Sequence, residues 1–478
     1  MTRIGGVLRN AYDASPESLR RVAGSVVNTL PAGFVYGRAY RRTLELLHQT
    51  EDWSVEQHRN WQIEQLRSLL LMAGERVPYY RRLFRETSFD PASVTALEDI
   101  QGLPLLTREM VRDLGSQLIP EGTPPSAYRY QTTGGTSGRP LGFAIAHEAS
   151  AAEWAFMTYQ WARVGYRRGS RRVVVRGRAI RGREHGKLWE FDPATQALHF
   201  SSFDLNPANM DRMVAVMQRY RPEFLHAYPS SATILAGHLE RRGLTLPSLK
   251  GLLLGSENFA PWQREYVERV FGVRAYTWYG HSEKCILAGE CERDILYHPF
   301  AEYGVTELVA EDGIPITVQG RRGLLVGTSF INRQGSIFIR YLTDDTAEWD
   351  LQDCDCGRSG RRLKELRGRW TQESLVAADG SLIPMTAVNL HSRVYERMVR
   401  FRFLQEQPGV ARLLFVPVAD FGERDEHELA EELRVRLAGR VEVTMEPVTD
   451  LPLTVSGKYT FVDQRIDIGS LAGTVGEA

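Results

Sequence analysis

Apolar positions along the chain predict three successive kinds of structure. Up to about residue 100, apolar side chains recur at helical spacing before a turn signal at Val77-Pro-Tyr-Tyr80. The recurring residues are Trp61, Leu66, Leu69, Leu70 and Met72. Between about residues 100 and 365, short β-rich runs alternate with helical stretches. Such alternation favours an α/β fold with a largely parallel sheet.

The elements expected in the alternating part are short. The predicted strands are Arg172-Val-Val-Val-Arg176, Gly251-Leu-Leu-Leu-Gly255, Leu324-Leu-Val-Gly-Thr328 and Ser336 to Tyr341. The predicted helices run from Asn209 to Tyr220 and from Pro261 to Val270.

Near residue 367 the chain becomes polar and rich in arginine, and we expect a hinge there followed by a smaller, mobile α+β domain. Its predicted strands are Arg400–Leu404, Val410–Pro417 and Val441–Glu446, with a helix at Asp425–Leu437. The expected division is a helical region of the large domain at 1–100, an α/β core at 101–366, the small domain at 367–465 and a flexible tail at 466–478.

Composition and charge fit a multi-domain enzyme and exclude several other classes. The 478 residues are 43% hydrophobic and 25% charged, which is ordinary globular usage. Fifty-nine basic residues balance 59 acidic ones, so no overall field attracts nucleic acid or an anionic membrane. No apolar run approaches the roughly 20 residues of a transmembrane helix, and the N-terminus lacks the apolar core of a signal peptide. A cytoplasmic location is expected, and the oligomeric state is left open.

The segment Tyr130-Gln-Thr-Thr-Gly-Gly-Thr-Ser-Gly-Arg-Pro140 combines glycines with hydroxyl side chains. Such a loop can direct successive N–H groups and hydroxyls at anionic oxygens, so we expect it to hold a polyphosphate. A polar turn is the alternative. The spacing fits neither the Walker pattern nor GxGxxG, which argues against a P-loop NTPase or a Rossmann dinucleotide site.

Six motifs occur in an order that resembles the phenylacetate-CoA ligase-like branch of the adenylate-forming ligases, over about residues 60 to 465. They are Thr132-Thr-Gly-Gly-Thr-Ser-Gly-Arg-Pro140, Gly255-Ser-Glu257, Tyr279-Gly-His-Ser-Glu283, Ile339-Arg-Tyr-Leu-Thr-Asp-Asp345, Gly368-Arg369 and Ser456-Gly-Lys458. Three further segments look most like CapK-type proteins, which are associated with capsular polysaccharide loci. They are Arg369-Trp-Thr-Gln-Glu373, Ile383-Pro-Met-Thr-Ala-Val-Asn389 and Leu453-Thr-Val-Ser-Gly-Lys-Tyr459.

The resemblance implies a reaction and its cofactors. An organic acid, possibly an aryl acid, attacks ATP in the presence of Mg²⁺, and the acyl-adenylate passes to a thiol, most commonly coenzyme A. One alternative is an amide or ester ligase acting on a sugar or an amino acid. Another is a non-catalytic nucleotide-binding protein of the same fold. The identity of the acid is not readable from the sequence.

The resemblance also implies roles for carboxylates and their neighbours. Glu283 matches the Mg²⁺ ligand, a role suited to a hard oxygen, although a surface glutamate is the alternative. Tyr279 is expected along the adenine and Ser282 near the α-phosphate, although Tyr279 could equally be a core residue. Asp345 matches the aspartate that grips the ribose hydroxyls, with Asp344 as a rival.

Lysine use draws attention to Lys458, because the chain has only five lysines. Lys458 matches the lysine that bridges the carboxylate and the α-phosphate as charge develops between them, which is worth on the order of 10²–10³ in rate. A solvated surface lysine is the alternative.

Other positions follow from the same resemblance. Gly255, Ser256 and Glu257 match the segment lining the adenine and acyl pocket, whose walls are expected to include His226, Tyr228, Pro229 and Ser256. Catalytic roles fall on Lys458, Glu283, Thr133 and Thr136. Contacts to ATP or AMP fall on Thr132, Gly134, Gly135, Ser137, Gly138, Arg139, Gly255, Ser256, Glu257, Tyr279, Gly280, His281, Ser282 and Asp345.

Two positions depart from the family's pattern. Arg139 stands where relatives often carry lysine after the phosphate loop, which keeps the charge but changes its reach. The acidic pair common after Gly-Arg is replaced by Trp370-Thr-Gln-Glu373, so Gln372 and Glu373 are the candidate hinge residues.

Four cysteines complete the candidate chemistry. Disulfides are not expected in a cytosolic chain. Cys291, His298, Cys354 and Cys356 make a closed set suited to structural Zn²⁺, and some phenylacetate-CoA ligase-like enzymes carry zinc at matching positions. The spacing is not that of a zinc finger, and reduced thiols without metal are the alternative. Cys285 is left over and is expected beside the active site.

Overall fold

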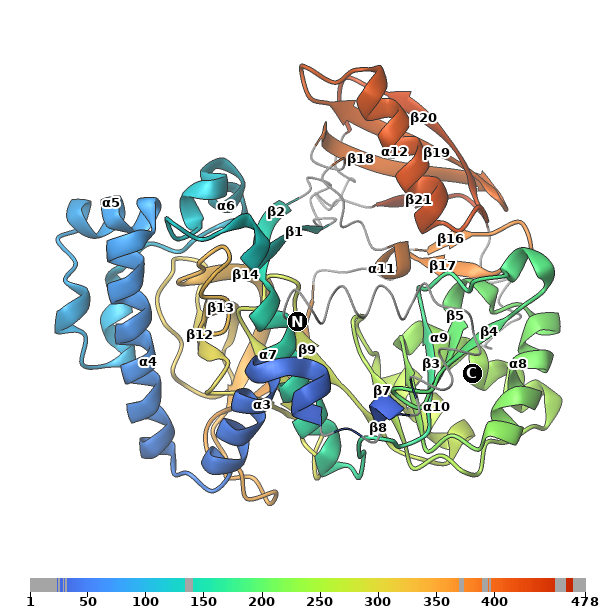
Figure 1. Cartoon of the computed structure of the whole chain (residues 1–478), viewed down its shortest axis with the longest axis horizontal. Helices are drawn as coiled ribbons and strands as arrows, with labels where there is room; N and C mark the ends of the chain where they lie inside the picture. The colour runs from blue at the N-terminus through green and yellow to red at the C-terminus, as the bar shows by residue number, and fades with distance from the viewer. Residues whose placement is uncertain are drawn as a thin grey trace. The chain divides into compact units, whose positions relative to one another are not determined.

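The computed structural model describes residues 24, 26–28, 30, 32–133, 141–368, 374–388, 394, 397–451 and 461–466. The chain divides into two compact units (Figure 1). Unit 1 comprises Met1–Gln131, Gly142–Arg168 and Tyr276–Arg369, and unit 2 comprises Thr132–Leu141, Gly169–Ala275 and Trp370–Ala478. The domain boundaries expected at residues 100, 366 and 465 stay predictions.

Unit 1 begins with helices, as the apolar periodicity predicts. They are α3 (Ala32–Thr50), α4 (Val55–Arg76), α5 (Pro78–Glu86), α6 (Arg108–Leu114) and α7 (His147–Arg163), with 3₁₀ turns at Pro91–Ser93, Leu97–Gly102, Gly115–Leu118 and Pro125–Ala127. A capping box between Ser54 and Gln57 starts α4. Val77 caps its C-terminal end, and Pro78 stands at the first position of α5, where its missing N–H is tolerated. The turn signal at Val77 to Tyr80 is therefore a boundary between two helices.

Among the described residues of unit 1, the strands form a seven-stranded sheet with the order β12-β13-β14-β15-β11-β10-β9. Its members are β9 (Trp278–Gly280), β10 (Leu287–Glu290), β11 (Tyr297–Pro299), β12 (Gly304–Val309), β13 (Arg322–Ser329), β14 (Tyr341–Asp350) and β15 (Arg362–Arg367). Neighbouring strands pair antiparallel. The expectation of a largely parallel sheet is wrong for this unit, because strands that pair after short connections leave no room for a parallel crossover. A separate ladder joins β1 (Tyr128–Thr133) to β2 (Leu141–Ala146).

The strand predicted from Ser336 to Tyr341 is also wrong, since β14 begins at Tyr341. The preceding backbone bonds to scattered partners rather than to one ladder. The Ile339 N–H donates to the Tyr80 hydroxyl at 3.0 Å, and the Arg340 N–H donates to Thr328 Oγ1 at 2.9 Å. Arg340 also has a positive φ of 52°. Asp345 consequently lies inside a strand instead of following one.

Unit 2 contains a six-stranded sheet among its described residues, with the order β4-β5-β3-β6-β7-β8. Its strands are β3 (Arg172–Arg176), β4 (Trp189–Asp192), β5 (Ala197–Ser201), β6 (Phe224–Ala227), β7 (Gly251–Leu254) and β8 (Ala275–Tyr276), and its helices are α8 (Pro207–Tyr220), α9 (Pro229–Arg242) and α10 (Pro261–Phe271), with 3₁₀ turns at Arg183–His185 and Ser202–Asp204. The central strands β5, β3, β6 and β7 pair parallel, as predicted. Proline stands in the first turn of each helix.

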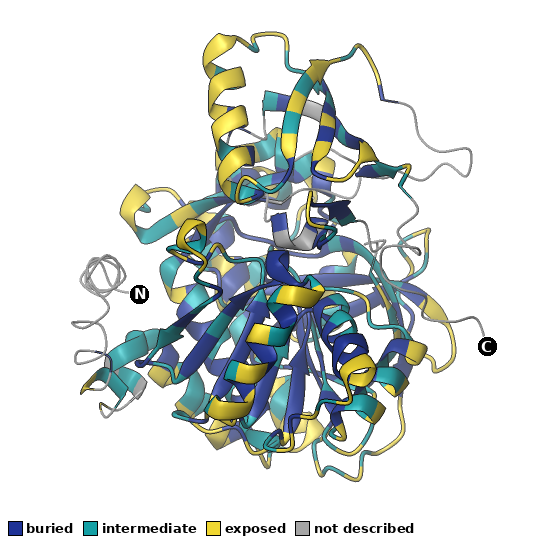
Figure 2. Cartoon of the chain, turned by 90° about the vertical axis from the view of Figure 1, so that its right-hand side faces the viewer, coloured by how far each residue is buried: buried dark blue, intermediate teal, exposed yellow. Residues whose placement is uncertain are grey.

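The core of this sheet is made by the strands and by the apolar faces of α8, α9 and α10. Valines and leucines fill it because strands buried on both faces need continuous apolar runs. Figure 2 shows the buried residues concentrated in the strands and the exposed ones on outward helix faces. The carboxyl ends of β3, β6 and β7 meet at one edge, where ligands bind in open α/β sheets.

The C-terminal part of unit 2 is the predicted α+β segment. It contains β16 (Ser374–Val376), β17 (Leu382–Pro384), α11 (Met385–Val388), β18 (Met398–Gln407), β19 (Val410–Pro417), α12 (Glu423–Arg436), β20 (Glu442–Pro447) and β21 (Val462–Gln464). A four-stranded sheet in the order β20-β19-β18-β21 packs against α12, which buries Leu429 and Leu433 (Figure 1). Within the described ranges, no helix is long and apolar enough to cross a membrane.

Candidate functional site

Several predicted residues lie outside the described part of the chain. They are the loop residues Gly134, Gly135, Thr136, Ser137, Gly138 and Arg139, the hinge candidates Gln372 and Glu373, and Lys458. At the edge of the loop, Thr132 is buried and Thr133 is the last residue of β1. The roles assigned to all of these residues stay predictions.

Glu283 is a buried carboxylate at the centre of a network in unit 1, with only 4% of its surface exposed. Its Oε1 accepts from the Tyr341 hydroxyl at 2.9 Å and from Arg108 Nη1 at 3.3 Å. A backbone bridge between Leu106 and Tyr341 brings the start of α6 beside the start of β14 and so places Arg108. The surface-glutamate alternative for Glu283 does not fit this environment.

His281 supplies the third donor to Glu283 and holds a defined tautomer. Its Nε2 accepts from the Ile286 N–H at 3.2 Å, so the ring proton lies on Nδ1, which donates to Glu283 Oε2 at 3.2 Å. Burial acts to raise the pKa of Glu283, but the hydrogen bond from His281 and the charge of Arg108 outweigh it and hold that pKa well below its ordinary value. The carboxylate is therefore ionised, as a ligand of a hard cation must be.

Asp345 is presented by a β-bulge. Leu324 pairs with Thr346 and Val326 with Leu342, so three residues of β14 oppose the single residue Leu325. Bulges redirect side chains and often adjoin functional sites. Here the Asp345 carboxylate accepts from the Tyr279 hydroxyl at 2.8 Å.

Asp344, the rival of Asp345, differs in its backbone. It occupies the left-handed region with φ 61°, a conformation that aspartate tolerates better than most residues. Burial acts to lower the pKa of Arg108, but the charges of Tyr341, Glu283 and Asp344 outweigh it and raise that pKa. The structure thus brings Asp345 to Tyr279 and leaves Asp344 in the electrostatic field of Arg108. Gly280 ends β9, and Ser282 follows in the turn that leads to Glu283.

The predicted acyl-pocket residues of unit 2 gather around an arginine that was not predicted from the sequence. Arg176, the last residue of β3, donates to His226 Nε2 at 3.1 Å and to Ser256 Oγ at 2.7 Å. Its guanidinium carbon lies 4.2 Å from the centre of the Tyr228 ring. Pro229 follows directly as the first residue of α9. Arg176 could have been found from its position, because the last residue of a parallel strand lies where such sheets bind ligands.

The turn after β7 is held in an unusual conformation. Ser256 has a positive φ of 71°, a costly conformation for a residue other than glycine. The neighbouring Glu257 accepts from the Ser230 N–H at 2.9 Å and from its hydroxyl at 3.0 Å, which fixes the turn to the start of α9. Gly255 is buried.

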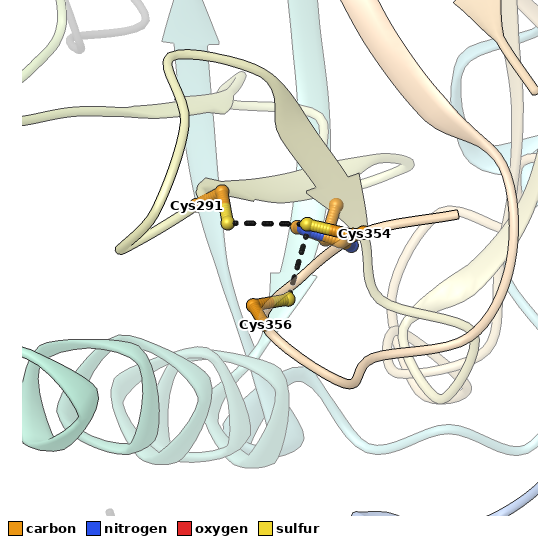
Figure 3. Close-up of side chains that lie close together, drawn as sticks. Cys291, Cys354 and Cys356 are labelled. Carbon is orange, nitrogen blue, oxygen red and sulfur yellow. Dashed lines mark hydrogen bonds between the residues drawn. The ribbon is translucent and has the colours of Figure 1, made fainter. Parts of the chain in front are cut away.

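Cys291, His298, Cys354 and Cys356 form a cluster in unit 1, with one potential ligand atom from each lying within 4.8 Å of the others. Figure 3 shows the three cysteines turned toward one another. Cys291 Sγ lies 3.5 Å from Cys354 Sγ, and Cys356 Sγ lies 3.5 Å from His298 Nε2. Tetrahedral Zn²⁺ with Zn–S bonds of about 2.3 Å places its sulfurs about 3.8 Å apart, so the donor set has the right type and size.

The surroundings of the cluster also suit bound thiolates. The Arg293 N–H points at Cys291 Sγ and Arg358 Nε at Cys356 Sγ, both at 3.3 Å. Burial and the charge of Arg358 lower the pKa of His298 to about 3, which keeps its imidazole neutral and able to coordinate.

Cys285 stays apart from this cluster, as predicted for the remaining cysteine. It is fully buried beside Glu283, whose carbonyl lies 3.6 Å from its sulfur. Burial raises the pKa of its thiol well above the ordinary value.

Comparison with known proteins supports the resemblance seen in the motifs. Residues 375–465 match the model of the CapK C-terminal domain. A phenylacetate-coenzyme A ligase of Thermus thermophilus is 26% identical over 434 residues, which cover 84% of this chain and 95% of that protein. The protein CapK of Staphylococcus aureus is 19% identical over 469 residues, covering 96% of this chain and all (100%) of that protein.

Solved structures give the fold. A 2-hydroxyisobutyryl-CoA ligase in complex with 2-HIB-AMP and CoA superimposes with a TM-score of 0.56 at 21% identity, covering 88% of this chain and 92% of that chain. The same ligase with R3-HIB-AMP gives a TM-score of 0.54 at 20% identity, over 87% and 91%. The predicted fold class is confirmed. The chain has the fold of these ligases. Its similarity to phenylacetate-coenzyme A ligases indicates an adenylate-forming acid-CoA ligase-like enzyme.

Proposed function

We propose that the protein activates an organic carboxylic acid with ATP and transfers the acyl group to a thiol, with coenzyme A as the expected thiol. In the first half-reaction a carboxylate oxygen bonds to the α-phosphorus and the bond to pyrophosphate breaks. In the second, a thiolate bonds to the acyl carbon and AMP leaves. The observation that carries the proposal is the similarity to a phenylacetate-coenzyme A ligase along 84% of the chain, with a buried Glu283 of lowered pKa at the matching motif.

Each role belongs to a residue with suitable chemistry. Asp345 offers two acceptor oxygens for the ribose hydroxyls, and Tyr279, whose hydroxyl already donates to that carboxylate, offers a ring for the adenine. Lys458 is proposed to stabilise the charge that develops between the acid and the α-phosphate.

Two metals fit residues of unit 1. Mg²⁺ suits the ionised Glu283, and when bound it neutralises phosphate charge. Zn²⁺ suits the Cys291, His298, Cys354 and Cys356 set, and its contribution there is structural because four protein ligands leave no open position. It would tie the segment after β10 to the loop between β14 and β15.

The acyl acceptor has a second candidate. The matched C-terminal model is that of CapK, so an amine or hydroxyl acceptor on a sugar or an amino acid competes with the thiol. These alternatives share the first half-reaction and differ only in the nucleophile of the second.

The experiment is acid-dependent pyrophosphate release measured with a panel of carboxylic acids, each with and without coenzyme A. Pyrophosphate release that needs an acid supports adenylation, and an acyl-CoA product identifies the acceptor. Acid-dependent acyl-AMP that is discharged only by an amine or a hydroxyl favours the second candidate. No acid-dependent release with any acid leaves a non-catalytic nucleotide-binding protein as the explanation.

A further inference from the structure

Arg176 differs from the other arginines near the carboxyl end of β3. Arg178 and Arg181 both pair with the buried Glu190, and Arg183 pairs with the buried Asp204. Among the described residues, no carboxylate lies within ion-pair distance of Arg176. Its partners are an imidazole, a hydroxyl and an aromatic ring.

These partners position the guanidinium without neutralising it. Because Arg176 donates to His226 Nε2, the proton of the neutral ring lies on Nδ1. Burial, followed by the charge of Arg176, lowers the pKa of His226 well below its ordinary value, so the histidine adds no second charge near neutral pH. One positive charge remains, held between Tyr228 and Ser256 at the edge where this type of sheet binds ligands.

A half-buried cation without a counter-ion is unfavourable unless a ligand supplies one. The fixed fork of an arginine, together with the Ser256 hydroxyl, suits a planar carboxylate or a phosphate. Ser256 is held in this arrangement with a positive φ, a conformation that persists where the surrounding structure enforces it.

We infer that Arg176 selects acids that carry a second anionic group, a carboxylate or a phosphate, in addition to the carboxylate that is adenylated. This inference rests on the proposed function and names its substrate class. The second group does not react; it pairs with the guanidinium, while His226 and Ser256 orient both. Charge-assisted hydrogen bonds of this kind contribute enough to change affinity by roughly 10–100-fold.

The test uses pairs of probe acids that share a skeleton: propionate with succinate, benzoate with isophthalate, and glycolate with phosphoglycolate. For the wild-type protein, pyrophosphate release should show a kcat/KM roughly 10–100-fold higher for the member that carries the second anionic group in at least one pair. Comparing the carboxylate pairs with the phosphate pair identifies which anion is used.

Arg176→Met should abolish this preference by raising KM for the acid with the second anionic group. The kcat for that acid, and the kcat/KM for the acid without the second group, should change by less than about threefold. Arg178→Met is the matched control, because it removes one positive charge from the same region while Glu190 keeps Arg181. Arg176→Lys should restore part of the preference. Arg176→Glu should favour β-alanine over propionate, an outcome that a merely structural arginine would not produce.

Titration calorimetry with the same acids separates this inference from the proposed function. Tighter binding of the acids with a second anionic group to wild type than to Arg176→Met, without any pyrophosphate release, supports the anion site and contradicts adenylation. Pyrophosphate release with equal kcat/KM within every pair, unchanged in Arg176→Met, overturns the inference and leaves adenylation intact.

Discussion

The two units place opposite charges in opposite environments. In unit 1, the Glu283 carboxylate receives donors from Arg108, Tyr341 and His281, so its charge is balanced inside the protein. In unit 2, the partners of the Arg176 guanidinium among the described residues are neutral groups, so no described carboxylate balances its charge.

Glu283 and Arg176 therefore represent two kinds of charged binding residue, one with its charge balanced by protein donors and one without a described counter-ion. A carboxylate that stays ionised while buried can bind the Mg²⁺ proposed for the reaction, whereas a guanidinium without a counter-ion discriminates among ligands by their charge. We therefore expect changes at Glu283 and its donors to affect folding and every substrate, and changes at Arg176 to affect only the choice of acid.

The largest expected effect is on stability. Arg108→Met leaves the buried Glu283 without its cation and should lower the free energy of unfolding by about 3–5 kcal/mol. Arg176→Met strands no buried carboxylate and should change it by less than about 1 kcal/mol. Urea denaturation measures both. The double variant Arg108→Met with Glu283→Met should regain much of the loss, and equal losses in the two single variants would show that the contrast between the units is not real.

Lys458 and Arg176 are both cations, but Lys458 is proposed to act on the rate of adenylation and Arg176 on the choice of acid. Lys458→Ala should cut acid-dependent pyrophosphate exchange by about 10²–10³-fold, with ATP affinity changed by only a few-fold, because the contact proposed for Lys458 is made in the transition state. Single-turnover kinetics with separately measured ATP binding check this. Equal losses in binding and in rate contradict the assigned role.

Within unit 1, the bulge makes a sharper comparison between two adjacent aspartates. Asp345→Asn should weaken ATP binding by roughly 10–100-fold, since a charged acceptor for the ribose is lost. Asp344→Asn, which tolerates the left-handed backbone, should change it by less than about threefold. Nucleotide titration measures both, and a reversed order assigns the ribose to Asp344.

The smallest effect on activity is expected at the metal cluster. Purified protein should contain about one zinc per chain, and Cys354→Ser should lose it, with a melting temperature lower by about 5 °C or more and activity reduced only indirectly. Cys285→Ser, at a buried cysteine outside the cluster, should keep the metal. If elemental analysis finds no zinc in protein that was purified without a chelator, the zinc site is contradicted. The cysteines of the cluster are then reduced thiols without metal.

The sequence predicted those features that local chemistry specifies. Parallel strands β3 and β7 were predicted from short runs of valine or leucine, which only strands buried on both faces need. The segment from Arg400 to Glu446 was predicted because its alternation and helical spacing fit one sheet and one covering helix. The four Cys and His residues were grouped by donor type, and the structure brings their side chains together.

Features that depend on distant partners were missed. The backbone of Ser336 to Arg340 has an apolar sequence that suits a strand, but its N–H groups bond to residues far away, such as Tyr80 and Thr328. Arg108 carries no local pattern that separates it from the many other arginines, and the only sequence signal for Arg176 is its place at the end of a strand. Only folding shows that Arg108 is buried against Glu283 and that no carboxylate of the described residues lies within ion-pair distance of Arg176.

The central claim is that this protein forms an acyl-adenylate, and isotope exchange between labelled pyrophosphate and ATP tests it most directly. Wild type should catalyse exchange that requires both Mg²⁺ and a carboxylic acid, and Glu283→Gln should lose most of it even though the variant, while less stable, still folds. Exchange that proceeds equally without acid, or that persists undiminished in Glu283→Gln, would contradict the account.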